Sequence, residues 1–156
     1  MAYQQTVTDT ATTFVVGAPT PEQTQFLKLG QKTLHKAIKA AKPGNQIRHI
    51  SKIMQKSIEA AGYNVTRNLT GHGLGETMHQ EPAIPCFISA DPQLKTRIVP
   101  GMVLAIEIMY MKGSWRLQLA DDGWTYETAD GSDSAMFEED VIITPDGPEI
   151  ITAISQ

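Results

Sequence analysis

Apolar residues recur at helical spacing in two stretches near the start of the chain. Residues 20–41 open with Thr-Pro-Glu, which supplies a capping oxygen, a first-turn proline and an acid near the positive end of the helix dipole. Pro43 and Gly44 end this stretch. Residues 46–61 repeat apolar side chains every three or four positions, and Gly62 follows as a C-terminal cap. The pattern predicts two amphipathic helices, each with one face to bury against a sheet.

Short β-type runs separated by turns fill most of the remaining chain. Residues 6–16 are rich in Thr and Val and place Asp9 on a face with mostly apolar neighbours. After the helices, Asp-Gly dipeptides mark turns between the runs. We predict strands over residues 63–69, 102–111, 114–120, 124–129, 135–144 and 149–152. Two helices covering one face of a curved, mostly antiparallel sheet give an α+β fold class.

Residues 71–82 are predicted to be a loop rather than a strand. Their glycines allow the backbone to come close to a ligand, and the prolines that follow make the loop rigid. His79 lies in this segment, where a single histidine is by itself a weak signal.

Length, composition and charge narrow the classes of protein. With 156 residues, of which 41% are apolar, the chain is expected to form one domain over residues 1–156. A net charge of -4 without a long run of one sign argues against a nucleic-acid partner, and no apolar run reaches the roughly 20 residues of a membrane helix. One cysteine, Cys86, and no signal-like N-terminus predict a reducing, cytoplasmic location.

Glu107 is the most informative single residue, because both faces of its predicted strand are apolar. A buried carboxylate must be protonated, paired with a base or bound to a metal. A salt bridge to Arg116 on the next strand is the simplest alternative to a metal. Glu138 raises the same question within an acidic triplet, for which a solvated acidic patch is the simplest alternative.

Four residues together offer the ligands of a metal site with open positions. Asp9, Glu107 and Glu138 supply carboxylate oxygens and His79 an imidazole, a set that suits Mn, Fe, Co or Zn. Carboxylates gathered without a cation would repel one another and raise their pKa values, so a metal is the natural reason to gather them. Strand periodicity does not bring the four together, so their convergence is a hypothesis.

Several motifs, in order along nearly the whole chain, resemble the C-terminal half of type I methionine aminopeptidases. They comprise residues 8–17, 71–85, 101–107, 122–125, 130–138 and 144–152. Members of this family have the pita-bread fold, in which two pseudo-symmetric α+β halves surround two divalent metal ions held by two Asp, one His and two Glu. The resemblance therefore implies an incomplete pita-bread fold and a metal cofactor.

Carried over by position, Asp9, His79, Glu107 and Glu138 match four of the five family ligands. The fifth, an aspartate, is expected upstream of Met1, which puts the second metal ion in doubt. The resemblance thus implies a single metallopeptidase-like domain that lacks the family's N-terminal half. Either that half or a second copy of the chain is the implied partner.

The implied activity is metal-dependent removal of N-terminal methionine from nascent polypeptides. Glu107 would carry a proton from the attacking water to the leaving amine, His79 would act beside it, and His72, Cys86 and Trp124 would contact substrate. The sequence differs from the family motifs at three places near these residues. Cys86 replaces a residue that is usually polar, Ile108 replaces a proline, and Glu138-Glu139-Asp140 replaces Glu-His-Thr.

Two other functions remain open at this point. A non-catalytic pita-bread module would use the same groove to bind peptides or proteins. A proline-specific peptidase of this fold matches less well, because residues 122–124 and 134–135 resemble the methionine enzymes.

Overall fold

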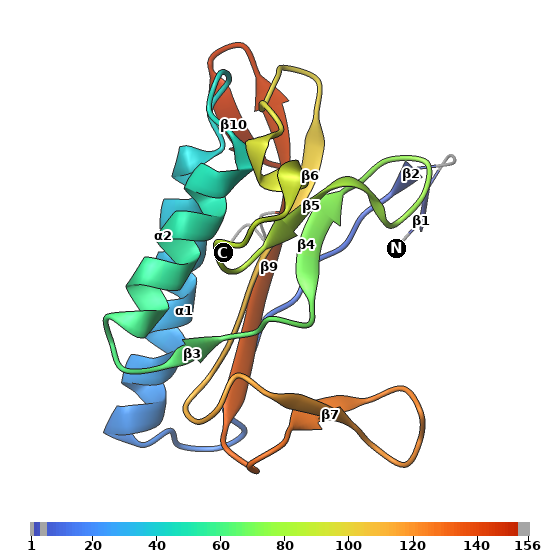
Figure 1. Ribbon diagram of the computed structural model, residues 1–156. Helices are drawn as coiled ribbons and strands as arrows, with labels where there is room; N and C mark the ends of the chain where they lie inside the picture. Colours follow the sequence, from blue (N-terminus) through green and yellow to red (C-terminus); the bar gives the residue numbers. More distant parts are fainter. Residues whose placement is uncertain (1, 4–5, 153–156) are drawn as a thin grey trace.

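The computed structural model describes residues 2–3 and 6–152, and shows two helices lying side by side on one face of a twisted antiparallel sheet (Figure 1). The helices are α1 (Pro21–Ala40) and α2 (Ile47–Glu59), and a 3-10 turn, η1, spans Pro92–Lys95. The predicted α+β class is therefore confirmed. The ends of the predicted domain, residues 1 and 153–156, lie outside the described residues.

Both helices begin and end close to the predicted positions. The Thr20 hydroxyl accepts a hydrogen bond from the backbone N–H of Gln23 at 3.1 Å, and the Gln23 side chain accepts one from the N–H of Thr20 at 2.9 Å. At the start of α2, the N–H of Gln46 donates to Nδ1 of His49 at 2.9 Å. Gly62, with φ of 83°, follows α2 in the left-handed conformation that glycine tolerates best.

The main sheet has strand order β10-β9-β6-β4-β5, with β3 also paired to β6, and every pairing is antiparallel. Its strands are β3 (Asn64–Val65), β4 (Thr70–Gly73), β5 (Gln80–Pro85), β6 (Val103–Met111), β9 (Ser134–Thr144) and β10 (Gly147–Ile150). A hairpin of β7 (Leu117–Leu119) and β8 (Tyr126–Thr128) projects from the body, and β1 (Ala2–Tyr3) pairs with β2 (Thr6–Val7) (Figure 1).

Strands β4 and β5 lie where the sequence predicted a loop, so that part of the prediction is wrong. The glycines of β4 do not break the strand, because they allow close approach of its neighbours. A Cβ atom at Gly71 would lie 2.5 Å from the carbonyl oxygen of Ala105 in β6, and one at Gly73 would collide with the backbone of Glu81 in β5. These glycines are thus a packing requirement of a crowded sheet.

The predicted strand over residues 6–16 is only partly regular. Beyond β2 the chain runs along β9, where Ala11 and Glu138 form a single bridge. The Thr13 hydroxyl donates to the carbonyl oxygen of Met136 at 2.8 Å and accepts from its N–H at 2.9 Å. A side chain therefore replaces part of the backbone ladder, which shortens the regular strand without detaching the segment.

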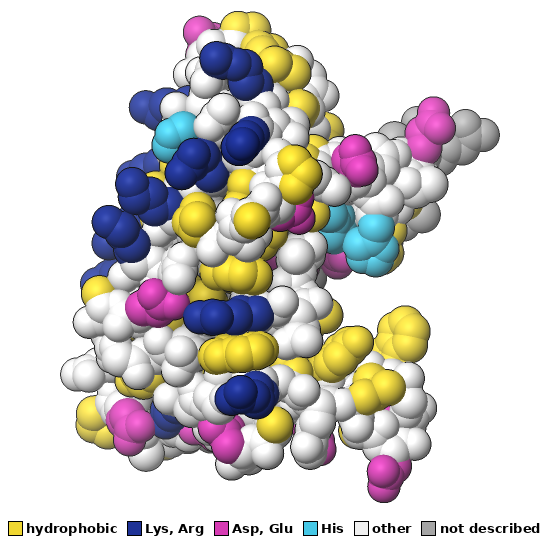
Figure 2. Space-filling model, viewed as in Figure 1, with side chains coloured by type: hydrophobic (Ala, Val, Ile, Leu, Met, Phe, Trp, Pro, Cys, Tyr) yellow, Lys and Arg dark blue, Asp and Glu magenta, His cyan; other side chains and the backbone are white. Residues whose placement is uncertain are grey.

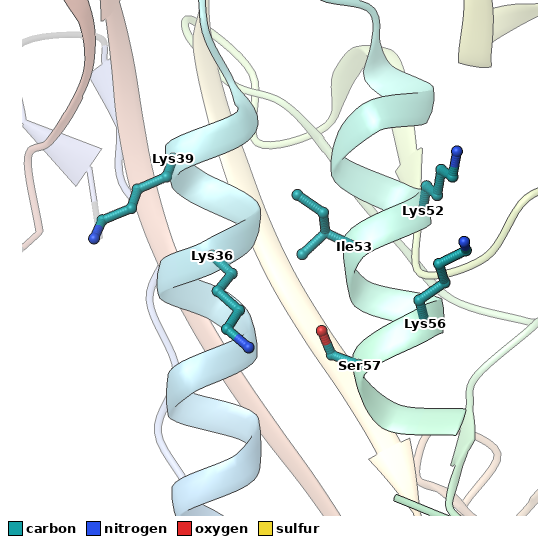
Figure 3. Close-up of a pocket in the computed structure, with 6 residues that line it drawn as sticks. All are labelled: Lys36, Lys39, Lys52, Ile53, Lys56 and Ser57. Carbon is teal, nitrogen blue, oxygen red and sulfur yellow. The ribbon is translucent and has the colours of Figure 1, made fainter. Parts of the chain in front are cut away.

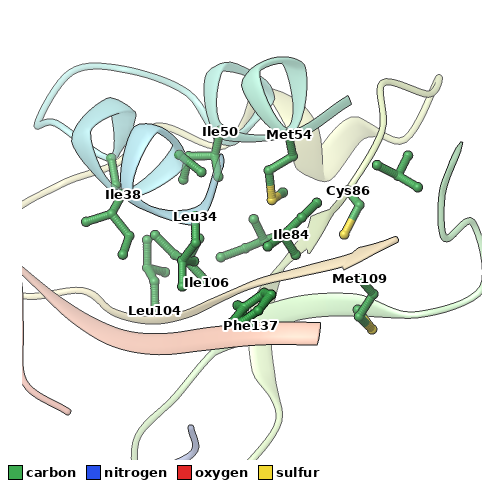
Figure 4. Close-up of a cluster of buried hydrophobic side chains, with 14 of the residues drawn as sticks. Leu34, Ile38, Ile50, Met54, Ile84, Cys86, Leu104, Ile106, Met109 and Phe137 are labelled. Atoms are coloured by element: carbon green, nitrogen blue, oxygen red, sulfur yellow. The ribbon is translucent and has the colours of Figure 1, made fainter. Parts of the chain in front are cut away.

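The two faces of β6 have different surroundings. Leu104, Ile106 and Ile108 belong to the buried core beneath the helices, together with Leu34 and Ile38 of α1, Ile50 and Met54 of α2 and Phe137 of β9 (Figure 4). By the alternation of a strand, Ala105 and Glu107 point to the opposite face. The acidic positions of the sheet therefore lie on the face away from the helices.

Gly30 lies where α1 packs tightly against the sheet. A Cβ there would lie 2.6 Å from both the Phe137 ring and the Tyr110 hydroxyl. Replacing Gly30 by alanine is therefore expected to destabilise the protein by about 1–3 kcal/mol through overpacking, despite the better helix propensity of alanine. Urea unfolding would measure this, with Gln31→Ala, at an exposed neighbouring position, as the control. A more stable Gly30→Ala variant would contradict the packing.

The outer face of the helices is strongly basic. Residues 21–59 carry only two acids, Glu22 and Glu59, whereas their exposed basic residues are Lys28, Lys32, Lys36, Lys39, Lys42, Arg48, Lys52 and Lys56. Lys and Arg side chains gather on the helix side of the molecule (Figure 2). A groove of about 400 Å³ between α1 and α2 is lined by four of these lysines and by Ile53 and Ser57 (Figure 3). Composition does not predict this basic surface, because its charges are spaced along two helices and the net charge of the chain is negative.

Within the described residues, neither helix has the length and apolar character needed to cross a membrane.

Candidate metal centre

Three side chains from distant parts of the sequence meet on the sheet face away from the helices. Asp9 follows β2, His72 lies in β4 and Glu138 lies in β9, and one possible ligand atom from each is within 4.8 Å of the others. His72 and Glu138 are buried and Asp9 is half-buried. Two carboxylates and an imidazole at this spacing can hold a divalent metal ion.

Strand register explains why these side chains face one way. In the antiparallel pairs, Ala105 lies opposite both His72 and Asp140, and Glu107 lies opposite Glu138. Residues directly opposite one another share a face, as do residues two apart in one strand. The register therefore places a histidine and three acids on one surface.

Asp9 reaches this surface because its segment is hydrogen-bonded to β9. Its N–H donates to Oδ2 of Asp140 at 2.8 Å. The Thr10 hydroxyl donates to the carbonyl oxygen of Glu138 at 2.9 Å, and the N–H of Glu138 donates to the carbonyl oxygen of Ala11 at 2.9 Å. These bonds hold the segment of Asp9 against β9, the strand that carries Glu138.

The electrostatics of the cluster favour a cation. Burial, with the nearby charge of Asp9, raises the pKa of Glu107 to about 7. Burial, followed by repulsion from Glu107 and other acids, raises the pKa of Glu138 to about 8. The pKa of Asp140 is also raised, chiefly by burial. Without a metal, Glu107 and Glu138 tend to hold protons near neutral pH, whereas a divalent cation would stabilise the ionised forms of the acids.

Neither alternative role predicted for these acids matches the structure. In the described part of the chain, the salt bridges join Lys112 to Glu22 and to Asp133, and none links Glu107 to Arg116. Glu138 is 3% exposed, so it is not part of a solvated patch. One buried acid oxygen, Oδ1 of Asp140, has no hydrogen-bond partner among the described residues. The donors present therefore fit a divalent metal ion.

Both predicted histidines lie next to one another beside these acids, and the roles predicted for them stay predictions. His72, expected to contact substrate, belongs to the group with Asp9 and Glu138. Its Nδ1 lies 2.9 Å from the carbonyl oxygen of Gly73, a bond that leaves Nε2 available as a ligand. His79, expected to be the ligand, is exposed near the start of the hairpin strand β5, outside this group, with its ring centroid 4.5 Å from that of His72.

Strand pairing makes His72 a further candidate ligand besides His79, which the loop expected over residues 71–82 did not indicate. Had residues 70–73 been taken as a strand, pairing with the strand of Glu107 would have made His72 a candidate for the same face. The two histidines are otherwise alike in sequence context, both lying in one glycine-rich segment.

The other two predicted substrate contacts lie apart from the metal-binding group. Cys86 is fully buried in the core, its thiol donates to the carbonyl oxygen of Glu107 at 3.5 Å, and burial raises the pKa of that thiol to about 12. Trp124 is 85% exposed in the turn between β7 and β8. Cys86 therefore supports the backbone of Glu107, and Trp124 is open to a ligand or to another chain segment.

Comparison with known proteins identifies the family of this chain. Residues 1–145 match the model of metallopeptidase family M24. A methionine aminopeptidase of Clostridium perfringens is 41% identical over 94% of this chain, and the chain spans 58% of that relative's length. The crystal structure of a Thermotoga maritima methionine aminopeptidase superimposes with a TM-score of 0.91 and 38% identity, over 97% of this chain and 60% of the other.

A prolidase from Pyrococcus furiosus shares the fold, with a TM-score of 0.76 at 24% identity over 99% of this chain and 39% of that protein. The fold is thus an incomplete pita-bread fold, as the sequence motifs implied, and the chain spans little more than half the length of the relatives it matches. Proteins of this family use divalent metal ions, for which Asp9, His72 and Glu138 form a candidate site. The chain belongs to metallopeptidase family M24.

Proposed function

We propose that this chain is the catalytic half of a methionine aminopeptidase, which removes N-terminal methionine from nascent polypeptides in the cytoplasm. The observation that carries the proposal is the cluster of Asp9, His72, Glu107 and Glu138 on one sheet face. Relatives named methionine aminopeptidase, at 36–41% identity, support it.

Asp9, His72 and Glu138 would hold the metal ion, with Glu107 beside them. When bound, a divalent ion such as Mn, Fe, Co or Zn lowers the pKa of water and polarises a carbonyl group. Glu107, with a pKa of about 7 in the cation-free protein, is suited to move a proton between water and the leaving amine near neutral pH. His79, exposed beside His72, would contact the substrate.

An apolar pocket on the same face supports a substrate with an apolar side chain. Met109 and Met136 are cross-strand partners in the register, two residues along β6 and β9 from Glu107 and Glu138. They line a pocket of about 230 Å³ together with Leu69, Leu117 and Tyr126. A methionyl side chain held near this pocket would bring its amide bond towards the acids.

A complete site needs a partner segment. The proposed partner is the N-terminal half found in longer relatives or a second copy of this chain, and it would supply the remaining ligand of a second metal ion. The edge beside β9 offers a place for it, because Phe14 is 73% exposed and Val16 91% exposed.

Replacing each of the two histidines by alanine tests which of them binds the metal ion. His72→Ala is expected to weaken Mn²⁺ binding at least tenfold, whereas His79→Ala should leave binding intact and lower only the hydrolysis of a Met-Ala-Ser peptide. Isothermal titration calorimetry and peptide hydrolysis would measure the two effects, with His49→Ala on α2 as the control. Loss of binding in His79→Ala alone would restore the sequence-based assignment.

A wild-type chain that binds no divalent ion would overturn the proposed metal site. It would favour the alternative, a pita-bread module that binds peptides or proteins without catalysis.

A further inference from the structure

Asp140 is a buried carboxylate beside the proposed metal site. It lies in β9 two residues after Glu138, so both side chains point to the same face, and its exposed fraction is 0%. In the row across the sheet, Ala105 separates Asp140 from His72. Residues directly opposite one another in adjacent strands share a face, so His72, Ala105 and Asp140 lie on one surface.

The two oxygens of Asp140 have different surroundings. Oδ2 accepts the N–H of Asp9 at 2.8 Å, while Oδ1 has no hydrogen-bond partner within the described residues. The backbone of Asp140 is fully used, because its N–H donates to the Thr152 hydroxyl and its carbonyl oxygen accepts from Ile151, both at 2.9 Å. The only Asp140 hydrogen-bonding atom without a partner among the described residues is therefore the side-chain oxygen Oδ1.

The fold itself does not need a charge at this position. A neutral acceptor such as asparagine could accept the N–H of Asp9 equally well. A buried carboxylate with an unpaired oxygen costs free energy, and no lysine or arginine pairs with it in the described part of the chain. Its neighbours Asp9 and Glu138 are proposed metal ligands, so a cation is the kind of partner that this oxygen could take.

We propose that Asp140 is part of the metal centre, fixing Asp9 with one oxygen and adding its charge to the attraction for a divalent cation with the other. The inference rests on the proposed function and extends it to a residue outside the predicted ligand set. Asp140 thus acts on the cation partly through Asp9, as a positioning residue.

The test separates charge from hydrogen bonding. Asp140→Asn keeps an acceptor for the N–H of Asp9 and removes the charge, whereas Asp140→Ala removes both. In the full 156-residue chain, Asp140→Asn is expected to bind Mn²⁺ at least tenfold more weakly by calorimetry while the cation-free protein becomes more resistant to urea. Asp140→Ala should lose affinity further and gain no stability. Asp146→Asn, in an exposed turn, is the matched control.

Opposite changes in affinity and cation-free stability are the signature of a metal-directed carboxylate, because a purely structural residue would lower both. Wild-type Mn²⁺ affinity in Asp140→Asn overturns the role of Asp140 and leaves the proposed function intact. A parallel loss of affinity and stability also overturns it. Absence of Mn²⁺ binding by the unmodified chain overturns the proposed function itself.

Discussion

Replacing Glu138 by glutamine is expected to lower the affinity for divalent cations by at least about 100-fold, because changes even to residues that only support metal ligands cost 10–100-fold. Glutamine preserves the shape of the side chain and leaves the backbone bonds of Glu138 to Thr10 and Ala11 in place. The cation-free variant should also be more stable than the wild type, since the variant removes a buried acid that repels Glu107.

Calorimetric titration with Mn²⁺ and thermal unfolding without metal would measure these two effects. Glu149→Gln is the matched control, because Glu149 lies on the neighbouring strand β10 but is exposed. If Glu138→Gln bound Mn²⁺ as tightly as the control, Glu138 would not be a ligand.

The cation-free protein is expected to be more stable at pH 5 than at pH 8. The pKa values of Glu107 and Glu138 in the folded protein, about 7 and about 8, lie above the value of about 4.3 for an unperturbed glutamate. Between these limits the folded state binds more protons than the unfolded state, so the free energy of unfolding falls as the pH rises. A loss on the order of 3 kcal/mol for each of the two groups follows from shifts of this size.

Urea unfolding at a series of pH values, with a chelator present, would follow this loss. Saturating Mn²⁺ should remove most of it, because the metal takes the place of the protons. The double variant Glu107→Gln, Glu138→Gln should show a clearly flatter profile in the same range. Stability that rises between pH 5 and pH 8 would mean that these acids are ionised and stabilised by other groups.

Local sequence patterns predicted the two helices and the burial of Glu107. The Thr-Pro-Glu start and the Pro-Gly end of α1 act within a few residues, so the sequence alone contains their effect. The alternation of β6 likewise indicated a buried Glu107, which is 6% exposed. In both cases the determining interactions are short-range.

The remainder of the site depends on pairing between distant strands. Gly71 and Gly73 suggest a loop until Ala105 and Glu81 are seen to crowd them, and only then does His72 fall opposite Ala105. In the sequence, Asp140 stands out only as a departure from Glu-His-Thr, because its burial and its bond to Asp9 follow from a register that sequence periodicity does not fix.

The segment around Asp9 has one further consequence for the whole chain. Asp9 and Asp140 are 131 positions apart, and they meet through one backbone bond to a side chain. A metal ion shared by Asp9 and Glu138 would cross-link the two ends of the fold and close a loop longer than 100 residues. For covalent links of that length the loop-entropy gain is about 4–5 kcal/mol. The ion would thus be a reversible cross-link that stabilises the fold as a disulfide does, with its occupancy set by the metal concentration instead of the redox potential.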